Sequence, residues 1–469
     1  MVDQPTPNAF AASNKSSQPI VGLHAKSAAC SGPFGLNIFD ARHTAQNVAA
    51  NAFLLGIVAG YGMLLSAMAS NLHSGVHVCS AMAMFVSFEY IQSAILGEAE
   101  SLAAFSFPKP YAVVLLLAVG FFENAVWQIL LGSSQSHMSV LLAYIGYTAL
   151  LITQIFRVIA RVGPLMKYTQ IKPFVTNSKL IFPYWSDACA SSLFWWVMSA
   201  QIAQRSIIGV ALVVYLKDLL KSSSVDAYVW PEVIKNKNSF RGFLGLPLYD
   251  GLHTCQNIAS YAFCLGFVAG CGCAIGTFTV MFRGLGIFLA SLTTFHIMEY
   301  ITTAMFQPDT SLKSFLLNHS PEYHIAMAGG IIEFLVETFF FPSFKVFSWI
   351  NGLGFLVVIA SQILRSVAMI TAGSNFTHYI SEDKKEDHIL ITTGIYAYLR
   401  HPSYTGFYYW SLGQQILLGN PACFVAYMFC LYTFFNSRIR FEERKLVEFF
   451  GDVYKDYRKT SYVLIPGIH

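Results

Sequence analysis

The residues best suited to chemistry lie in the C-terminal part of the chain, in a short motif and on a charged segment that follows it. The motif is Arg400-His-Pro-Ser-Tyr404, and it is preceded by the polar stretch Gly373–His388. Proline favours the first turn of a helix, so the motif is expected at a helix N-terminus, where backbone N–H groups and the helix dipole attract anions. Arg438 and Glu442 are four residues apart and share one helix face. The pattern predicts a pocket for a ligand with both charges, although spacing alone equally allows a helix with surface ion pairs.

The composition shows what kind of structure must position these residues. The chain has 469 residues, of which 55% are hydrophobic and 12% are charged, and its mean hydropathy is +0.52. Soluble globular proteins carry about 25% charged residues. This chain therefore has too few charges to cover a water-facing surface, and we expect an integral membrane protein in contact with the lipid bilayer. A net charge of +4 without basic runs argues against nucleic acid as a partner.

The sequence repeats itself at an offset of 210 residues. Phe39-Asp-Ala-Arg-His-Thr-Ala-Gln-Asn47 recurs as Tyr249-Asp-Gly-Leu-His-Thr-Cys-Gln-Asn257. Leu55-Gly-Ile-Val-Ala-Gly60 recurs as Leu265-Gly-Phe-Val-Ala-Gly270. These matches predict a tandem duplication. The expected parts are a polar, disordered N-terminal tail over residues 1–32, a diverged membrane repeat over 33–235, and a membrane repeat over 236–469 that carries the motifs.

Apolar runs predict an all-α membrane bundle with about twelve spans in two parallel repeats. In the first repeat the spans fall near 46–70, 76–97, 110–131, 138–160, 189–203 and 206–220. In the second they fall near 254–280, 284–306, 323–342, 347–371, 404–418 and 421–436. The last pair of each repeat is short and is expected to form a tight helical hairpin. Basic residues gather in the even-numbered loops, which predicts that both termini and the pocket face the cytosol.

Charges inside the predicted spans are costly and need partners. They are expected to pin helices together through Glu–Arg or Glu–His pairs, with His296 as a candidate partner for Glu299. His43 and His253 stand at matching helix starts and are expected to cap them. The nine cysteines include no Cys-x-x-Cys pair, so neither a disulfide framework nor a metal site is expected.

From about Gly373 to the C-terminus the sequence closely resembles the isoprenylcysteine carboxyl methyltransferases of the endoplasmic reticulum. The Arg-His-Pro-x-Tyr motif and the later Glu-Glu pair are shared with phospholipid methyltransferases and some membrane sterol reductases. The longer run around them points to the isoprenylcysteine enzymes. The matching segments are Ala372-Gly-Ser-Asn-Phe376, His388-x-Leu-x-Thr-x-Gly394, Arg400-His-Pro-Ser-Tyr404, Tyr409-Trp-Ser411, Asn420-Pro421, Glu442-Glu443 and Phe450-Gly-x-x-Tyr454.

The resemblance implies an active site for S-adenosylmethionine and a prenylated substrate at the endoplasmic reticulum membrane. Arg438 would hold the substrate carboxylate. Ser381 stands where the family can place a cofactor-binding glutamine, and its shorter side chain would cost one hydrogen bond, about 0.5–1.5 kcal/mol. The remaining implied cofactor contacts are His388, Ile389, Leu390, Ile391, Tyr396, His401, Pro402, Ser403, Tyr404 and Glu442.

The implied reaction methylates the C-terminal α-carboxylate of a prenylated cysteine, in CaaX-processed proteins or in prenylcysteine small molecules. That carboxylate has a pKa of about 3.5 and is ionised at neutral pH, so the reaction needs no general base and no metal. Arg438 and His401 are the candidate catalytic residues. For His401, contact with the cofactor or support of the backbone is favoured over a role as base.

Three alternatives remain from the sequence. A phospholipid or other lipid methyltransferase, or a membrane sterol reductase, would share the Arg-His-Pro-x-Tyr pocket. Twelve spans in two parallel halves are also the layout of a transporter, although the polar motifs occur in one half alone. The repeat over 33–235 is expected to be a non-catalytic scaffold, which would mimic a homodimer partner, regulate the second half or widen a lipid-facing entrance.

Overall fold

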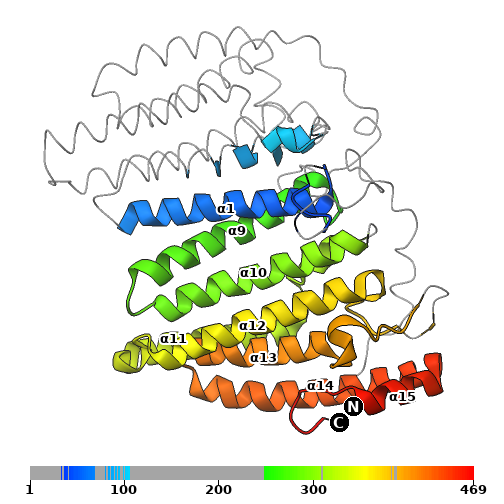
Figure 1. Ribbon diagram of the computed structural model, residues 1–469. Coiled ribbons are helices and arrows are strands. Elements are labelled where there is room, and N and C mark those ends of the chain that lie inside the picture. Colours follow the sequence, from blue (N-terminus) through cyan, green and yellow to red (C-terminus); the bar gives the residue numbers. More distant parts are fainter. Residues whose placement is uncertain are drawn as a thin grey trace, which may run out of the picture.

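A computed structural model describes two parts of the chain (Figure 1). They are residues 33, 36–40 and 42–68 with scattered positions between 80 and 105, and residues 248–468 with gaps at 308–309, 319, 382 and 385–387. The predicted tail over 1–32 and the predicted spans near 110–131, 138–160, 189–203 and 206–220 lie outside the described residues. The span predicted near 76–97 is described in part. Over the described residues the chain forms helices and one isolated β-bridge, between Leu399 and Tyr462.

Six of the described helices are long and apolar enough to cross a membrane, which makes the chain a multi-pass membrane protein. Five of them begin and end within about two residues of the predicted ranges. Pro321 begins one of these helices, and the side chain of Ser320 caps it by accepting a hydrogen bond from Tyr323 N. The six are α1 (Ala45–Met68), α9 (Cys255–Phe278), α10 (Arg283–Phe306), α11 (Pro321–Phe340), α12 (Trp349–Ala372) and α14 (Pro421–Phe450).

The predicted C-terminal hairpin exists, but its second helix is longer than expected. The first helix is α13 (Pro402–Leu418), and with 17 residues it is not among the six. The second, α14, runs on past residue 436, where the sequence reading ended it, and the charged segment is its continuation. No glycine or proline interrupts residues 422–450. The helix therefore continues to Gly451, whose φ of 59° ends it, and the short α15 (Asp452–Thr460) follows.

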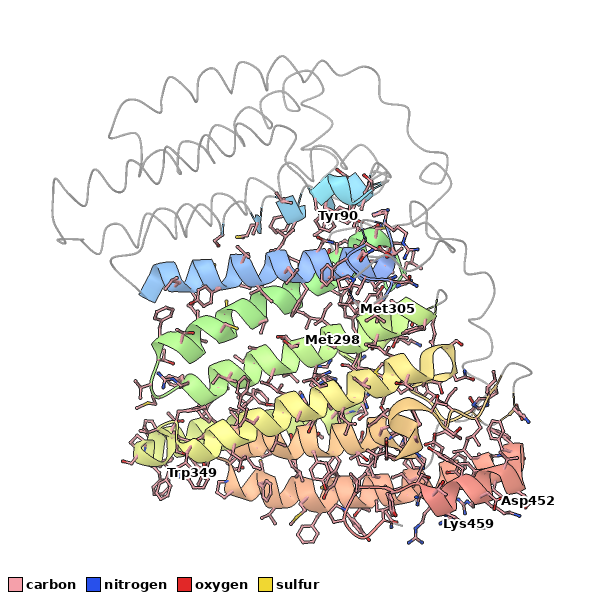
Figure 2. The ribbon with its side chains drawn as sticks, in the orientation of Figure 1. Tyr90, Met298, Met305, Trp349, Asp452 and Lys459 are labelled. Atoms are coloured by element: carbon pink, nitrogen blue, oxygen red, sulfur yellow. The ribbon has the colours of Figure 1, made fainter. Side chains whose placement is uncertain are left out.

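The helices lie side by side from α1 to α14, with α15 and the C-terminal tail at the end next to α14 (Figure 1). One buried cluster joins α1, α9 and α10, and a second joins α10, α11, α13 and α14. Glycine permits the close contact between α12 and α13, because a Cβ at Gly406 would lie 2.9 Å from Cβ of Arg365. Large apolar side chains face outward, such as Trp349, which is 78% exposed at the start of α12 (Figure 2). Such outward faces suit a lipid environment.

Two expectations about polar residues in the bundle are wrong. His43 and His253 do not cap helices: their Nε2 atoms lie 2.6 and 2.7 Å from the hydroxyls of Tyr90 and Tyr300. His296 does not pair with Glu299, because its Nδ1 lies 2.8 Å from the Phe315 carbonyl oxygen. In both cases the partner lies on a different segment, which spacing along one helix does not reveal.

Charged side chains, of which Lys345 is buried, secure the α13–α14 hairpin. Lys345 Nζ donates to the carbonyls of Leu418 at 3.1 Å and Gly419 at 2.8 Å, and it pairs with Glu337 at 2.6 Å. The carboxylate of Glu333 accepts the backbone N–H groups of residues 422 and 423 at 2.8 and 2.6 Å. Lysine thus satisfies carbonyls at the end of α13, and glutamate satisfies N–H groups at the start of α14.

Candidate active site

The N-terminus of α13 forms one wall of the candidate site. His401 occupies the N-cap position and Pro402 the first helical position, as the motif predicts. The segment before the helix is held by the C-terminal tail, since Arg400 N donates to Tyr462 O at 3.1 Å and Tyr462 N donates to Tyr398 O at 2.9 Å. The motif is therefore fixed on one side by α13 and on the other by the last residues of the chain.

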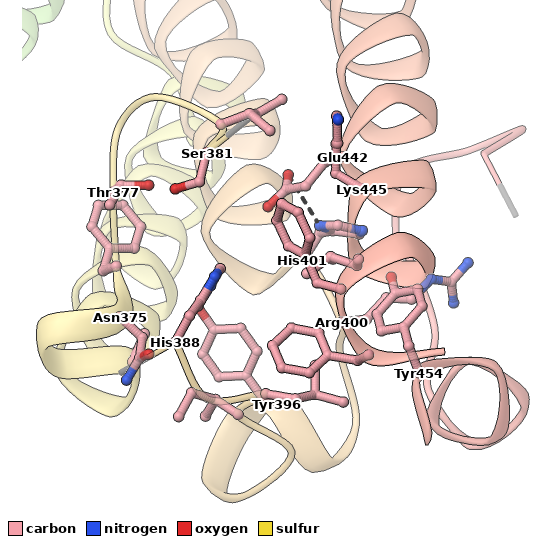
Figure 3. Close-up of a pocket in the computed structure, with 18 of the residues that line it drawn as sticks. Asn375, Thr377, Ser381, His388, Tyr396, Arg400, His401, Glu442, Lys445 and Tyr454 are labelled. Carbon is pink, nitrogen blue, oxygen red and sulfur yellow. Dashed lines mark ion pairs between the residues drawn. The ribbon is translucent and has the colours of Figure 1, made fainter. Parts of the chain in front are cut away.

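A single pocket collects the eleven residues that the sequence predicts as cofactor contacts. It lies between the loop that follows α12, the start of α13, and the end of α14 (Figure 3). The predicted residues that line it are Ser381, His388, Ile389, Leu390, Ile391, Tyr396, His401, Pro402, Ser403, Tyr404 and Glu442.

The pocket also contains residues that the sequence analysis did not assign. Lys445 and Phe449 project from α14 three and seven residues after Glu442, on the same helix face. That helical spacing was the signal that could have identified them. Asn375 and Thr377 contribute from the loop after α12, and Asn375 Oδ1 accepts the backbone N–H of Ile389 at 3.0 Å. This bond fixes the segment that begins at His388 against the loop.

The two adjacent glutamates of α14 have different environments. Glu443 is tied into the protein, because its carboxylate lies 2.6 Å from Nε of Arg400, 3.3 Å from Nε2 of His401 and 3.4 Å from Nε of Arg458. Glu442 faces the pocket opposite Thr377 and Ser381 (Figure 3).

The carboxylate of Glu442 is available to a ligand. Its Oε2 is buried and accepts no hydrogen bond from any described residue, and the nearest basic atom is Nδ1 of His401 at 3.7 Å. A buried carboxylate oxygen without a hydrogen bond is costly. Glu442 therefore suits the cationic or hydroxyl part of a ligand. Tyr396 stands near it, and burial together with the Glu442 charge raises the pKa of Tyr396 above its usual value, so this side chain is a neutral phenol at pH 7.

Arg438 lies in a second, smaller cavity rather than in the pocket of Glu442. Their spacing on one helix face predicted one pocket for the two charges, whereas the structure divides them between two adjoining cavities. The cavities share Phe376, Thr377, Ser403 and Tyr404. The division arises because Arg438 donates from Nε to the Tyr404 hydroxyl at 2.9 Å and from Nη2 to the His378 carbonyl at 2.7 Å. The remaining wall of this cavity is mostly aromatic and includes Phe295, Tyr323, Phe407, Phe434 and Phe435.

A buried ionic network stands behind both cavities. Glu299 on α10 is fully buried, and its carboxylate accepts two hydrogen bonds from Arg365 at 2.5 and 2.7 Å and contacts Nε2 of His378 at 2.9 Å. Arg365 also donates from Nη1 to the backbone oxygen and the hydroxyl of Ser403 at 3.1 and 2.9 Å. The predicted Glu–Arg pinning of helices is thus present. It also supports Ser403 in the motif, and His378 is a member that the sequence analysis missed.

Comparison with known proteins identifies the family. The family model for isoprenylcysteine carboxyl methyltransferases matches residues 353–448. A protein-S-isoprenylcysteine O-methyltransferase of Dictyostelium discoideum is 50% identical over 199 residues, which are 42% of this chain and 83% of that protein. The chain belongs to the isoprenylcysteine carboxyl methyltransferase family. The Homo sapiens protein-S-isoprenylcysteine O-methyltransferase is 44% identical over 212 residues, 45% of this chain and 75% of the relative.

A solved structure of a eukaryotic intramembrane Ras methyltransferase of the same family is 33% identical, covers 61% of this chain and 96% of its own, and gives a TM-score of 0.45. Membership confirms the resemblance read from the motifs and makes the chain a membrane methyltransferase. The lipid methyltransferase, sterol reductase and transporter alternatives are not favoured. The described residues contain no group of three or more His, Cys, Asp or Glu that could hold a metal ion.

Proposed function

We propose that this protein transfers the methyl group of S-adenosylmethionine to the C-terminal α-carboxylate of a prenylated cysteine. The single observation that carries the proposal is the pair of adjoining cavities. One presents the carboxylate of Glu442, whose Oε2 is buried, and the other presents the guanidinium of Arg438 among aromatic rings. Ser403 and Tyr404 belong to both, so ligands in the two cavities would meet at the start of α13.

The residues of the first pocket suit S-adenosylmethionine, which supplies a methyl group activated by a sulfonium. Glu442 accepts from the amino or hydroxyl groups of the cofactor and is satisfied by doing so. The segment His388–Ile391, Tyr396 and Ser381 also line this pocket. His401 is held between the carboxylates of Glu442 and Glu443 and lies parallel to the ring of Tyr404. Its role is therefore to position these groups rather than to remove a proton.

The second cavity suits the prenylcysteine. Two bonds fix the guanidinium of Arg438, and its other N–H groups make no hydrogen bond to any described residue, so they remain for a carboxylate. The carboxylate is ionised at neutral pH and is itself the nucleophile, which leaves orientation and exclusion of water as the tasks of the protein. The aromatic wall receives the first carbons of the prenyl chain, where each buried methylene contributes about 0.8 kcal/mol.

The cellular setting belongs to the same proposal. Substrates are prenylated proteins processed at a CaaX sequence, or prenylcysteine small molecules. The lysine and arginine asymmetry supports about twelve spans with both termini and the site in the cytosol, and the resemblance to the isoprenylcysteine enzymes supports the endoplasmic reticulum membrane as the location. Residues 236–469 form the catalytic unit, and the repeat over 33–235 is non-catalytic.

A methyl-transfer assay tests the proposed function. Membranes that contain the protein are incubated with labelled S-adenosylmethionine and N-acetyl-S-farnesylcysteine, and base-labile methyl ester is counted. The proposal predicts ester with the farnesylated substrate, none with N-acetylcysteine, and loss of ester in Arg438→Ala. Equal ester formation from N-acetylcysteine and from the farnesylated substrate would contradict the proposal. The absence of ester from a protein that binds the cofactor would also contradict it.

A further inference from the structure

Helices α1 and α9 touch along faces that contain glycine at matching positions. A Cβ at Gly56 of α1 would lie 2.9 Å from Cα of Gly266, and a Cβ at Gly270 of α9 would lie 2.6 Å from the backbone N of Tyr61. Neither helix could carry a side chain at these points without separating. In lipid, where apolar side chains gain little from association, such backbone-to-backbone packing is a main source of helix–helix affinity.

The contacts between the two helices are reciprocal. A Cβ at Gly56 would collide with the Phe263 carbonyl, and a Cβ at Gly266 would collide with the Phe53 carbonyl. Gly56 corresponds to Gly266 and Phe53 to Phe263 at the repeat offset of 210 residues, so each contact becomes the other when the two repeats are exchanged. The same holds for Gly60 against residue 267 and Gly270 against residue 57. Contacts that interchange in this way define an interface with two-fold symmetry.

The surroundings of the two helices obey the same offset. Asn47 Nδ2 donates to Asp40 at 2.6 Å, and Asn257 Nδ2 donates to Asp250 at 2.6 Å. The tyrosines bound by His43 and His253 each stack on a phenylalanine, with ring centroids 3.7 and 3.9 Å apart. Over residues 51–60 of α1 and 261–270 of α9 the exposed positions also correspond, 54 and 58 on α1 and 264 and 268 on α9. The symmetry therefore includes the glycine contacts and also the side-chain contacts that hold each helix in place.

We infer that the face of α9 covered by α1 is self-complementary, and that α1 occupies the place that α9 of a second copy of the chain would take. The sequence indicates that α1 takes the place of a second α9, since α1 carries Leu55-Gly-Ile-Val-Ala-Gly60 where α9 carries Leu265-Gly-Phe-Val-Ala-Gly270. The chain thus contains the interface of a two-fold dimer, and its own N-terminal part blocks pairing with another chain through α9.

A helix exchange in the full-length chain tests this inference. Residues 45–65 are replaced by a copy of residues 255–275, which brings a cysteine to position 61 opposite the native Cys271. Cys271 Sγ already lies 3.6 Å from the Gly60 carbonyl oxygen, so the two thiols would be close to the symmetry axis. The matched control is the same exchange with leucine in place of the two glycines at positions 56 and 60. Purified protein in nanodiscs is oxidised, and disulfides and the number of chains per particle are measured.

The inference predicts that the exchanged protein forms the 61–271 disulfide within one chain, and that the leucine control and a Cys271→Ser version lose it. It also predicts that the wild-type chain forms no Cys271–Cys271 disulfide between chains, whereas Gly56→Leu with Gly60→Leu does. Adding Gly266→Leu with Gly270→Leu should abolish that cross-link. Failure of the exchanged helix to cross-link, equal cross-linking in the leucine control, or an interchain Cys271 disulfide in wild type would overturn it.

Discussion

Glu442→Gln should weaken cofactor binding without destabilising the protein. The Oε2 atom of Glu442 is buried in the pocket and accepts no hydrogen bond from any described residue. Removing its charge therefore breaks no hydrogen bond at Oε2, and it relieves part of the cost of burying that charged oxygen. The cofactor, in contrast, loses a charged acceptor.

The size of the effect follows from the exposure of the side chain. A hydrogen bond to a charged group contributes about 1.5–3 kcal/mol, which is about 10- to 150-fold in a dissociation constant. The Glu442 side chain is 27% exposed, so solvent competes and the lower end applies. We expect the dissociation constant of S-adenosylmethionine to rise about 10- to 30-fold.

The adjacent residue supplies a matched control. Glu443→Gln removes the same charge one position away, but Glu443 holds Arg400 at 2.6 Å and Arg458 at 3.4 Å. Breaking a buried pair costs about 3–5 kcal/mol, so this variant should unfold at a lower temperature. Equilibrium binding of labelled cofactor and thermal unfolding are measured for both variants. The reasoning is refuted if Glu442→Gln binds the cofactor like wild type, or if the two variants show the same loss of thermal stability.

Two further substitutions separate the ionic network behind the site from the one that secures the hairpin. Glu299→Gln leaves Arg365 without its charged partner and loosens Ser403, so the KM for the cofactor should rise and the unfolding temperature should fall. An unchanged KM in initial-rate assays would show that this network does not support the site. Lys345→Met removes the bonds that satisfy the end of α13 and should cost about 3–5 kcal/mol of stability while sparing the cofactor KM. Thermal unfolding and initial rates are both measured for Lys345→Met, and a raised KM for the cofactor would contradict the prediction.

The helices of the C-terminal half could be predicted from the sequence because their signals are local. Apolar length set the spans, and Pro402 marked the start of α13. The end of α14 was misplaced because the apolar run stops near residue 436, whereas no glycine or proline ends the helix there. Composition changes there from membrane-like to charged, but the helix continues to the glycine at 451.

Partners across the bundle could not be predicted, because they depend on packing. His253 meets Tyr300 at a separation of 47 residues, and Glu299 meets His378 at 79. Spacing along α10 favoured His296 as a partner of Glu299, because the two residues are three positions apart. Contacts between helices are set by how the helices cross, which no local spacing encodes.

The candidate site shows the same limit at its centre. Resemblance to a family named the residues around the pocket, and the structure brings all eleven together. Helical spacing put Arg438 and Glu442 on one face of α14, which is correct, but did not show Tyr404 bonded to Arg438 on the side of the second cavity. The separation into two cavities depends on a side chain from α13, which a reading of α14 alone cannot supply.

The central claim is that Arg438 recognises the carboxylate of a prenylcysteine while a neighbouring pocket holds the cofactor. Its most direct test is competition binding of N-acetyl-S-farnesylcysteine and of its uncharged carboxamide to wild type and Arg438→Ala. The account predicts that wild type prefers the carboxylate, that Arg438→Ala loses this preference, and that both bind S-adenosylmethionine with equal affinity. A variant that still prefers the carboxylate, or that loses cofactor affinity to the same extent, would contradict the account.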